Sequence, residues 1–243
     1  MNALDLTKLH RDGCYEFGPC LSDTDRVRLL EHFDRLDASP RIPPGYQPQY
    51  DGDGASRRLR KLRRMIWNDR SLFGPILNRM GAPDVAERII GPGAVLILHA
   101  AFLKPAYVGT HVAPHQDQAL WSRQYPRAFS MWVALTEVCP DNGGLYGYPG
   151  SHAGGVIPHQ QDSNHPWHDT LTYVAPQLGA PYEFRLAPGE AVIWDRAFVH
   201  ASRVNTSPHD RRGMVIVFAD GGVADFQSRD SLSLAQLRAL ADE

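Results

Sequence analysis

Hydrophobic residues repeat with a helical period in the first part of the chain and with a strand period in the second. Between residues 22 and 36, apolar side chains recur every three or four positions, which predicts an amphipathic helix. These positions are Val27, Leu29, Leu30, Phe33 and Leu36. Ser22, with Asp25 three residues on, resembles a capping box and predicts where the helix begins. A second helical region is predicted over about residues 68–90.

From residue 94 onward the pattern is that of strands. Two apolar sets alternate in residues 94–103, which indicates a strand buried on both faces. Further strands are predicted at 112–118, 127–137, 144–148, 182–186, 190–195 and 213–219. Glycine and proline separate them, as at Pro149-Gly150 and Pro188-Gly189. Many short strands with such turns predict a mainly β fold with flanking helices, a double-stranded β-helix (a cupin-like jelly roll).

The remaining segments suggest one domain. Residues 38–56 are rich in Pro, Gly, Ser and Asp and predict a long surface loop, and residues 153–181 predict an excursion rich in His, Pro, Gln and Asn. Without repeats or a visible boundary, we expect a single domain over residues 1–243. Its parts are a helical portion at about 1–92, a jelly-roll core at about 93–220 and a terminal helix at about 231–242, capped by Ser233.

Composition excludes several classes. Of 243 residues, 43% are hydrophobic and 21% charged, and the net charge of −2 gives no bulk attraction to nucleic acid or anionic membranes. The three cysteines, Cys14, Cys20 and Cys139, have no repeated spacing, which favours a reducing compartment. Residues 1–11 carry charges and no apolar run, so we expect no signal peptide, no membrane span and a cytoplasmic location.

The strongest chemical signal is the tripeptide His115-Gln116-Asp117. In a strand, residues i and i+2 point the same way, so His115 and Asp117 can reach one metal ion. A second imidazole, such as His200 from another strand, would complete the set that mononuclear iron(II) oxygenases use. Most histidines are not ligands and the chain has 11, so the pair needs support from other residues.

Arg211 gives that support. It begins the apolar run at 213–218, which would place a cation at the mouth of a buried sheet. A guanidinium there can bind the far carboxylate of a diacid through two hydrogen bonds, and the Ser202 hydroxyl can add a contact. The keto-acid end of such a co-substrate would chelate the iron.

With these residues together, the sequence resembles the phytanoyl-CoA dioxygenase family, a branch of the iron(II)/2-oxoglutarate oxygenases. Matching segments occur in the family's order between about residues 94 and 219. They are Leu103-Lys104-Pro105, Pro114-His115-Gln116-Asp117, Met131-Trp132-Val133-Ala134-Leu135, Asp141-Asn142-Gly143-Gly144-Leu145, Pro149-Gly150-Ser151-His152 and the segment from His200 to Arg211.

The resemblance implies that His115, Asp117 and His200 are both the catalytic centre and the ligands of Fe(II). It implies that 2-oxoglutarate and O2 are co-substrates. Arg211, Ser202, Gln116 and Trp132 would line the co-substrate pocket. The expected reaction is hydroxylation of an unactivated carbon with release of succinate and CO2; desaturation or cyclisation is the alternative. Related halogenases have a small residue where this chain has Asp117, so chloride chemistry is not expected.

Other polar residues receive structural interpretations. We expect a structural role for His152, and a surface position for His159, His165 and His168. Arg212 should point away from Arg211, as a surface cation. The six cations of residues 57–64 allow three interpretations: nucleic-acid contact, a solvated face whose two leucines touch the core, or a Lys61-centred site for an anionic substrate or co-substrate.

The substrate is expected to be a small molecule. An amino acid or natural-product intermediate comes first, and a group tethered to coenzyme A or a carrier protein comes second. Two other classes stay open: a zinc hydrolase with the same ligands, and a non-catalytic jelly-roll binding protein. Nucleic acid is a less favoured partner, a membrane is not expected, and the residues indicate no oligomeric state.

Overall fold

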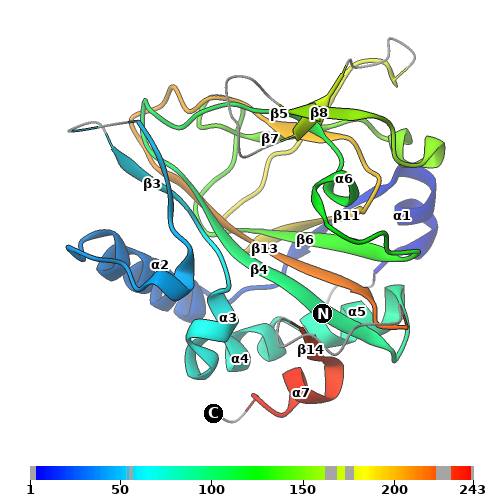
Figure 1. Ribbon diagram of the computed structural model, residues 1–243, viewed down its shortest axis with the longest axis horizontal. Helices are drawn as coiled ribbons and strands as arrows, with labels where there is room; N and C mark the ends of the chain where they lie inside the picture. The colour runs from blue at the N-terminus through cyan, green and yellow to red at the C-terminus, as the bar shows by residue number, and fades with distance from the viewer. Residues whose placement is uncertain are drawn as a thin grey trace.

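The computed structural model describes residues 4–52, 54, 57–161, 169–172, 178–222 and 231–241. A large antiparallel sheet, with strand order β1-β11-β6-β13-β4-β3-β2 and β14 beside β4, forms its centre (Figure 1). Its strands are β1 (Cys14–Pro19), β2 (Gln49–Asp51), β3 (Arg58–Leu62), β4 (Ala94–Lys104), β6 (Ala128–Ala134), β11 (Glu190–Asp195), β13 (Arg211–Asp220) and β14 (Leu232–Ser233).

A smaller antiparallel sheet, of order β10-β7-β12-β5, lies beyond the inner face of the large one. Its strands are β5 (Val112–His115), β7 (Leu145–Gly147), β10 (Tyr182–Glu183) and β12 (His200–Ser202). A hairpin of β8 (His159–Gln161) and β9 (Asp169–Leu171) lies beside β5. The two facing sheets with helices outside are the predicted jelly roll.

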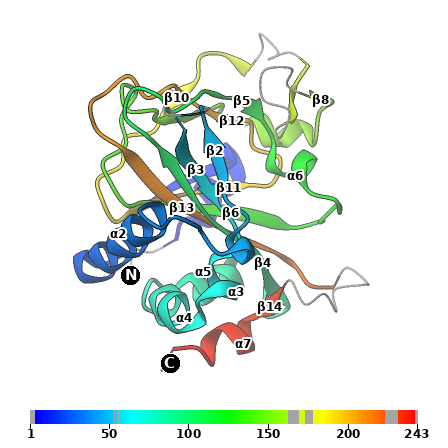
Figure 2. The same ribbon diagram turned by 60° about the vertical axis from the view of Figure 1, so that its left-hand side comes forward.

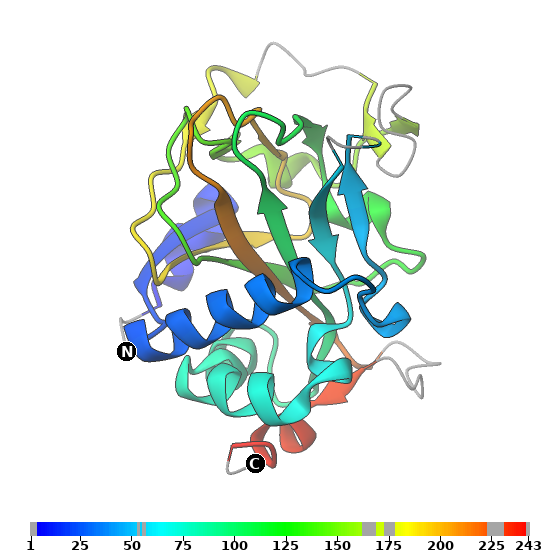
Figure 3. The same ribbon diagram turned by 90° about the vertical axis from the view of Figure 1, so that its left-hand side faces the viewer.

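Helices cover the outer face of the large sheet (Figures 1 and 3). They are α2 (Asp23–Asp37), α3 (Met65–Asn68), α4 (Arg70–Arg79), α5 (Ala82–Ile89) and α7 (Leu234–Arg238). The short α1 (Leu6–Asp12) packs on β1, α6 (Asp117–Leu120) follows β5, and single 3-10 turns occupy Pro44–Tyr46 and Ser151–Gly154. No helix in the described parts of the chain is long and apolar enough to cross a membrane.

Alternation along the central strands separates two cores. In β13, Met214, Ile216 and Phe218 pack under the helices, in one cluster with Phe33 of α2 and Ile76 of α4. Val215 and Val217 point the other way and join a second cluster between the sheets. Because strand side chains alternate with a period of two, the residues that line the inner face can be read from the strand register, except at the bulge where Val217 and Phe218 pair with β4.

Several sequence predictions are confirmed. The helix predicted from residue 22 is α2, and the Ser22 side chain accepts a hydrogen bond from the Asp25 backbone N–H. The second helical region contains α4 and α5, and Ser233 caps α7, which is shorter than predicted. The strand predicted at 112–118 was too long, because β5 ends at His115 and Asp117 begins α6.

Residues 1–92 were predicted to form a helical portion. They contain helices, but they also supply β1, β2 and β3 to the large sheet (Figure 2). β2 lies inside the predicted loop of residues 38–56, and the predicted excursion contains β8 and β9; its residues 162–168 and 173–177 lie outside the described parts. These strands are short, and pairing with other strands rather than local hydrophobic alternation specifies them; β2 pairs with the nearby β3 and β8 with β9, whereas β1 pairs with the distant β11.

Candidate iron and co-substrate site

The two predicted imidazole ligands lie side by side on adjacent strands of the small sheet. His115 ends β5 and His200 begins β12, and the two residues are direct partners in the strand register. Their ring centroids are 4.2 Å apart. The Asp117 Oδ1 atom lies 3.9 Å from Nε2 of His115 and 3.7 Å from Nε2 of His200. One ligand atom from each residue therefore lies within 4.8 Å of the others, as a shared metal ion requires.

Backbone carbonyls fix the tautomer of both histidines. The Nδ1 atom of His115 lies 2.9 Å from the Ala113 carbonyl oxygen, and Nδ1 of His200 lies 3.1 Å from that of Phe198. A carbonyl only accepts, so Nδ1 carries the proton in each ring. Nε2 is then the nitrogen that carries the lone pair in each ring, and such a backbone hydrogen bond at Nδ1 is the usual support of a metal-binding histidine.

The Asp117 carboxylate is held through one oxygen. Its Oδ2 accepts hydrogen bonds from Ser130 Oγ at 2.5 Å and from Trp194 Nε1 at 2.8 Å. Both donors come from the inner face of the large sheet, where Ser130 and Trp194 are register partners. Oδ1 remains directed at the imidazoles, so the carboxylate is positioned to supply a single oxygen ligand.

A cavity of about 340 Å³ leads from these ligands along the inner face of the large sheet. Ser202, Trp132 and Arg211 line it together with the three ligands, so the structure brings six of the seven predicted site residues to one space. Two imidazoles and one carboxylate with open cavity beside them fit an iron(II) ion, although zinc accepts the same donors.

The environment of Arg211 favours an iron oxygenase over a zinc hydrolase. Its side chain is 2% exposed; Nη2 donates to the Gly143 carbonyl at 3.0 Å, and Nε and Nη1 are buried without a partner. Its guanidinium carbon lies 5.2 Å from the centroid of the Trp132 ring. Burial lowers the pKa of Arg211 to about 9, which still leaves it charged at neutral pH. A buried cation with free donors fits a carboxylate ligand such as the distal end of 2-oxoglutarate.

Gln116 is the predicted site residue that the structure does not bring to this cavity. Its amide nitrogen donates to the carbonyls of Gly155 at 2.9 Å and Ala197 at 2.5 Å, and its oxygen accepts from the Ile157 N–H at 2.8 Å. The side chain is fully buried, so its hydrogen-bonding capacity joins backbone segments rather than a ligand. This is the outward direction that the alternation around His115 and Asp117 requires.

Two further histidines, His159 and His152, have structural roles. The surface position expected for His159 was wrong: the ring is half-buried, its Nε2 accepts from the Gln116 N–H at 2.9 Å, and burial lowers its pKa. His152 contacts the His10 carbonyl at 3.0 Å, consistent with the structural role expected for it. His165 and His168 lie outside the described residues.

The basic run forms β3 and divides between two environments. Leu59 and Leu62 are buried in the outer core, as the solvated-face interpretation expected. Arg60 is also buried and lies 3.4 Å from Asp51 in an ion pair. Lys61 and Arg63 line the cavity, and burial followed by the nearby Arg63 and Arg60 lowers the pKa of Lys61 to about 7. This geometry favours the anion-binding interpretation over contact with nucleic acid.

Sequence reasoning missed Ser130 and Trp194. Both sit in strands of continuous burial, where nothing local separates a polar core residue from one that orients a ligand. Spacing provides the one available signal: Trp132 and Ser130 share a strand face, so a pocket assigned to one extends to the other.

A jelly roll that joins a two-histidine, one-carboxylate centre to an unpaired buried guanidinium defines a mononuclear iron oxygenase that uses 2-oxoglutarate. The model of the phytanoyl-CoA dioxygenase (PhyH) family matches residues 9–213. The chain belongs to this family of iron(II)- and 2-oxoglutarate-dependent oxygenases.

Named relatives agree with this assignment. The ectoine dioxygenase of Nocardia farcinica is 28% identical over 55% of this chain, and the match spans 50% of that protein. The chain thus corresponds to about half the length of this relative. The L-proline trans-4-hydroxylase of Streptomyces griseoviridis is 26% identical over 86% of this chain and 82% of its own length.

Solved structures share the fold. EvdO2 from Micromonospora carbonacea var. aurantiaca, complexed with 2-oxoglutarate, superposes with a TM-score of 0.74 at 24% identity, over 90% of this chain and 92% of its own. The epimerase SnoN, in complex with Fe3+, alpha ketoglutarate and nogalamycin RO, gives a TM-score of 0.68 at 20% identity, over 91% of this chain and 87% of its own.

Proposed function

We propose that this protein hydroxylates an unactivated carbon of a small polar metabolite and releases succinate and CO2. The observation that carries the proposal is Arg211, whose unpartnered Nε and Nη1 lie on the cavity shared with the three metal-ligand candidates. A zinc hydrolase would have no use for this buried guanidinium, and a binding module would have no use for the three converging ligands.

His115, Asp117 and His200 would hold the iron. Bound there, iron supplies the oxidation of a C–H bond by O2, coupled to decarboxylation of 2-oxoglutarate. Arg211 grips the distal carboxylate of the co-substrate, and the Ser202 hydroxyl, buried on the same cavity, adds a contact. Trp132 lies beneath the guanidinium as a rigid wall that excludes water.

Asp117 favours hydroxylation among the reactions open to this centre. Its carboxylate occupies the position that chloride would need, and two hydrogen bonds hold it there. Hydroxylation is also what the name of the proline hydroxylase states for that relative. Epimerisation, named for SnoN, and desaturation or cyclisation use the same centre and differ in the mass of the product. A product that gains one oxygen atom supports hydroxylation.

The cavity favours a small polar substrate. A volume of about 340 Å³ is at the lower end for ligand pockets and must also hold the co-substrate. Away from the ligands its lining mixes apolar side chains, such as Phe102, Leu120 and Trp121, with polar and charged ones. The polar and charged ones are Gln49, Asp51, Arg63, Thr110 and Asp169. An amino acid or similarly functionalised metabolite suits these groups better than a long acyl chain. Arg60 and Lys61 line the cavity, where they can meet an anionic group of a small substrate.

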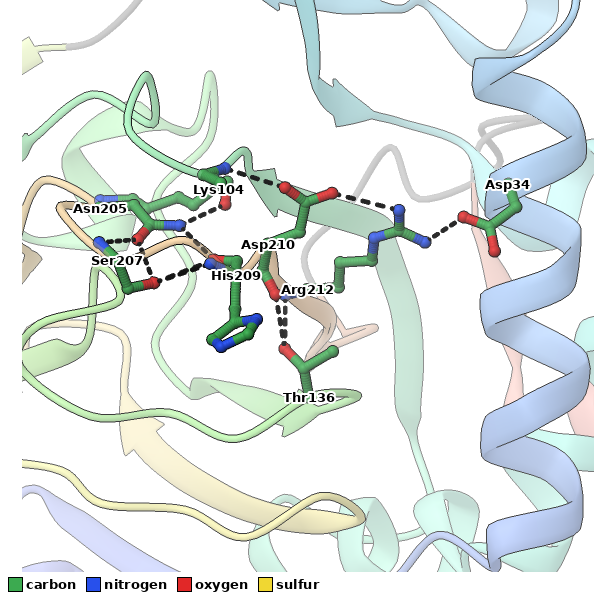
Figure 4. Close-up of polar contacts among 9 residues, drawn as sticks. Asp34, Lys104, Thr136, Asn205, Ser207, His209, Asp210 and Arg212 are labelled. Carbon is green, nitrogen blue, oxygen red and sulfur yellow. Dashed lines mark hydrogen bonds and ion pairs between the residues drawn. The ribbon is translucent and has the colours of Figure 1, made fainter.

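An anaerobic titration with iron(II) and 2-oxoglutarate tests the proposal. We expect a visible metal-to-ligand charge-transfer band that saturates with 2-oxoglutarate, and succinate formation when a substrate is added in air. Arg211→Ala should weaken 2-oxoglutarate binding at least tenfold, because it removes charge-assisted hydrogen bonds. Arg212→Ala is the matched control, because Arg212 pairs with Asp34 and Asp210 outside the cavity (Figure 4). Undiminished succinate formation by Arg211→Ala would refute this role of Arg211.

A further inference from the structure

We infer that Lys104 is a second cation of the co-substrate subsite, placed opposite Arg211, and that the distal carboxylate of the co-substrate binds between the two. The inference rests on the proposed use of 2-oxoglutarate and adds to it a residue that acts on one end of that molecule. Lys104 is the last residue of β4, in the Leu103-Lys104-Pro105 segment.

The strand register places the two cations side by side. Lys104 of β4 is the direct partner of Arg211 of β13. Side chains at paired positions leave the sheet on the same face, with Cβ atoms about 5 Å apart. Lys104 is 5% exposed and Arg211 is 2% exposed, and both line the cavity. Like charges at directly opposite positions are destabilising, so a buried pair of this kind requires a reason.

The protein itself supplies little counter-charge. The Lys104 ammonium donates to the Arg203 carbonyl, which takes one of its three hydrogens. Asp51 is the carboxylate that acts on Lys104, but it also pairs with Arg60 at 3.4 Å and accepts from Thr110 Oγ1 at 3.0 Å. Burial, followed by the nearby Arg211 and Arg60, holds the pKa of Lys104 well below its usual range despite Asp51. A bound carboxylate would supply the missing negative charge.

The turn at Asp141-Asn142-Gly143-Gly144 is built against both cations. Gly143 has a φ of +84°, and its carbonyl accepts the hydrogen bond from Arg211 Nη2 at 3.0 Å. A Cβ atom at position 143 would lie 2.5 Å from Cδ of Lys104. The Gly143 carbonyl therefore binds the Arg211 guanidinium, and the absence of a Cβ atom at this position leaves space for the aliphatic part of the Lys104 side chain. Asn142 secures this turn through hydrogen bonds to the Cys139 N–H at 2.9 Å and the Glu137 carbonyl at 2.8 Å.

A polar network fixes the backbone around the pair. Asn205 donates to the Lys104 carbonyl at 2.9 Å and to the His209 carbonyl at 2.8 Å (Figure 4). Beside Arg211, the Arg212 N–H donates to Thr136 Oγ1 at 2.9 Å, and the Arg212 side chain pairs with Asp34 of α2. The two cations thus project from backbone that has little freedom to separate them.

A purely structural role would make Lys104 a brace for the Arg203 carbonyl. The two roles differ in their dependence on the co-substrate's distal carboxylate. 2-Oxopentanoate has the same keto-acid end and chain length as 2-oxoglutarate but no distal carboxylate. Loss of a brace would disturb the binding of both molecules, whereas loss of a carboxylate contact affects 2-oxoglutarate alone.

The test measures binding of both acids to the iron(II)-loaded protein without oxygen, by calorimetry and by the charge-transfer band. For Lys104→Met we expect the dissociation constant of 2-oxoglutarate to rise by about tenfold to a hundredfold. That of 2-oxopentanoate should change less than about twofold. Lys104→Gln, which keeps a donor for the Arg203 carbonyl without the charge, should behave in the same way. Lys8→Met, on an exposed helix turn, is the control for loss of a lysine charge.

The outcomes separate this inference from the proposed function. If the wild-type protein bound 2-oxoglutarate no better than 2-oxopentanoate, the proposed diacid co-substrate itself would fail. If the wild-type protein preferred 2-oxoglutarate and both Lys104 variants kept that preference, the role of Lys104 alone would be overturned. Equal weakening of both acids would assign Lys104 the brace role.

Discussion

The indole Nε1 of Trp194 donates a hydrogen bond of 2.8 Å to Oδ2 of Asp117, the carboxylate oxygen that is not directed at the two imidazoles. The same indole ring lies 4.5 Å from the ring of His200, centroid to centroid. One side chain of the large sheet therefore contacts two of the three metal-ligand candidates. The metal centre lies between the sheets, and its orientation depends on how they pack.

Trp194→Phe should weaken iron binding by about tenfold, because supporting contacts of this kind contribute about 10- to 100-fold to metal affinity and Ser130 remains as a second donor. The phenyl ring keeps most of the packing against His200. Competition with a chelator under anaerobic conditions measures the affinity. Trp67→Phe is the matched control, because the Trp67 Nε1 atom is buried without a hydrogen-bond partner and lies outside the site. Equal iron affinity in both variants would contradict the orienting role of Trp194.

Asp117→Gly should abolish the proposed hydroxylation. The substitution removes the anionic ligand candidate and leaves the donors of Ser130 and Trp194 without their acceptor. Product formation is measured by mass spectrometry beside succinate release, with the wild-type protein at matched iron loading. Turnover that persisted in this variant would argue against direct ligation by Asp117.

Gly213→Ala should disturb the wall beneath Arg211. A Cβ atom at position 213 would lie 2.1 Å from Cζ2 of Trp132, in the six-membered ring of the indole. We expect a loss of about 1–3 kcal/mol in the free energy of unfolding, as for other overpacked cores. Trp132→Phe removes the atoms that collide, so the double variant should be more stable than the sum of the two single losses. If urea denaturation showed that the two single losses in the free energy of unfolding simply add in the double variant, the contact between position 213 and Trp132 would not be the cause of the loss in Gly213→Ala.

The metal ligands were predictable to the extent that they are local. His115 and Asp117 are two residues apart, and Gln116 between them is extended, with φ −119° and ψ 131°. They therefore point the same way although the strand has already ended at His115. The same alternation argued against placing Gln116 in the cavity, where the family resemblance had placed it. His200 is brought to His115 by strand pairing across a long separation, so the residues alone offered it as a candidate and the resemblance singled it out.

Residues whose roles depend on distant strand pairing or on packing against another element could not be assigned from sequence. Lys104 was visible as part of a motif, but its relation to Arg211 follows from the β4–β13 register, which no local pattern specifies. Trp194 shares a strand face with Val192 like any buried strand residue, and its hydrogen bond to Asp117 requires the start of α6, after β5, to reach the inner face of the sheet. For the same reason β1 escaped prediction, because its partner β11 is distant in sequence.

His99 should make the protein's stability depend on pH. It lies on the outer face of β4, is fully buried, and has both ring nitrogens without a hydrogen-bond partner; the Phe73 ring packs edge-on at 4.9 Å. Burial lowers the pKa of His99 from 6.5 to about 3. Above about pH 6.5 neither the folded nor the unfolded chain binds this proton, so the stability of the neutral ring is fully present. As the pH falls below 6.5 the unfolded chain takes up a proton that the folded protein excludes, which lowers the free energy of unfolding by about 1.4 kcal/mol per pH unit.

Urea denaturation of the metal-free protein between pH 7.5 and about pH 5 should therefore show a weaker pH dependence of the free energy of unfolding in His99→Leu than in wild type. His209→Gln, at an exposed position, should keep the wild-type slope of the free energy of unfolding against pH. If His99→Leu also kept the wild-type slope, His99 would bind its proton equally in the folded and unfolded states.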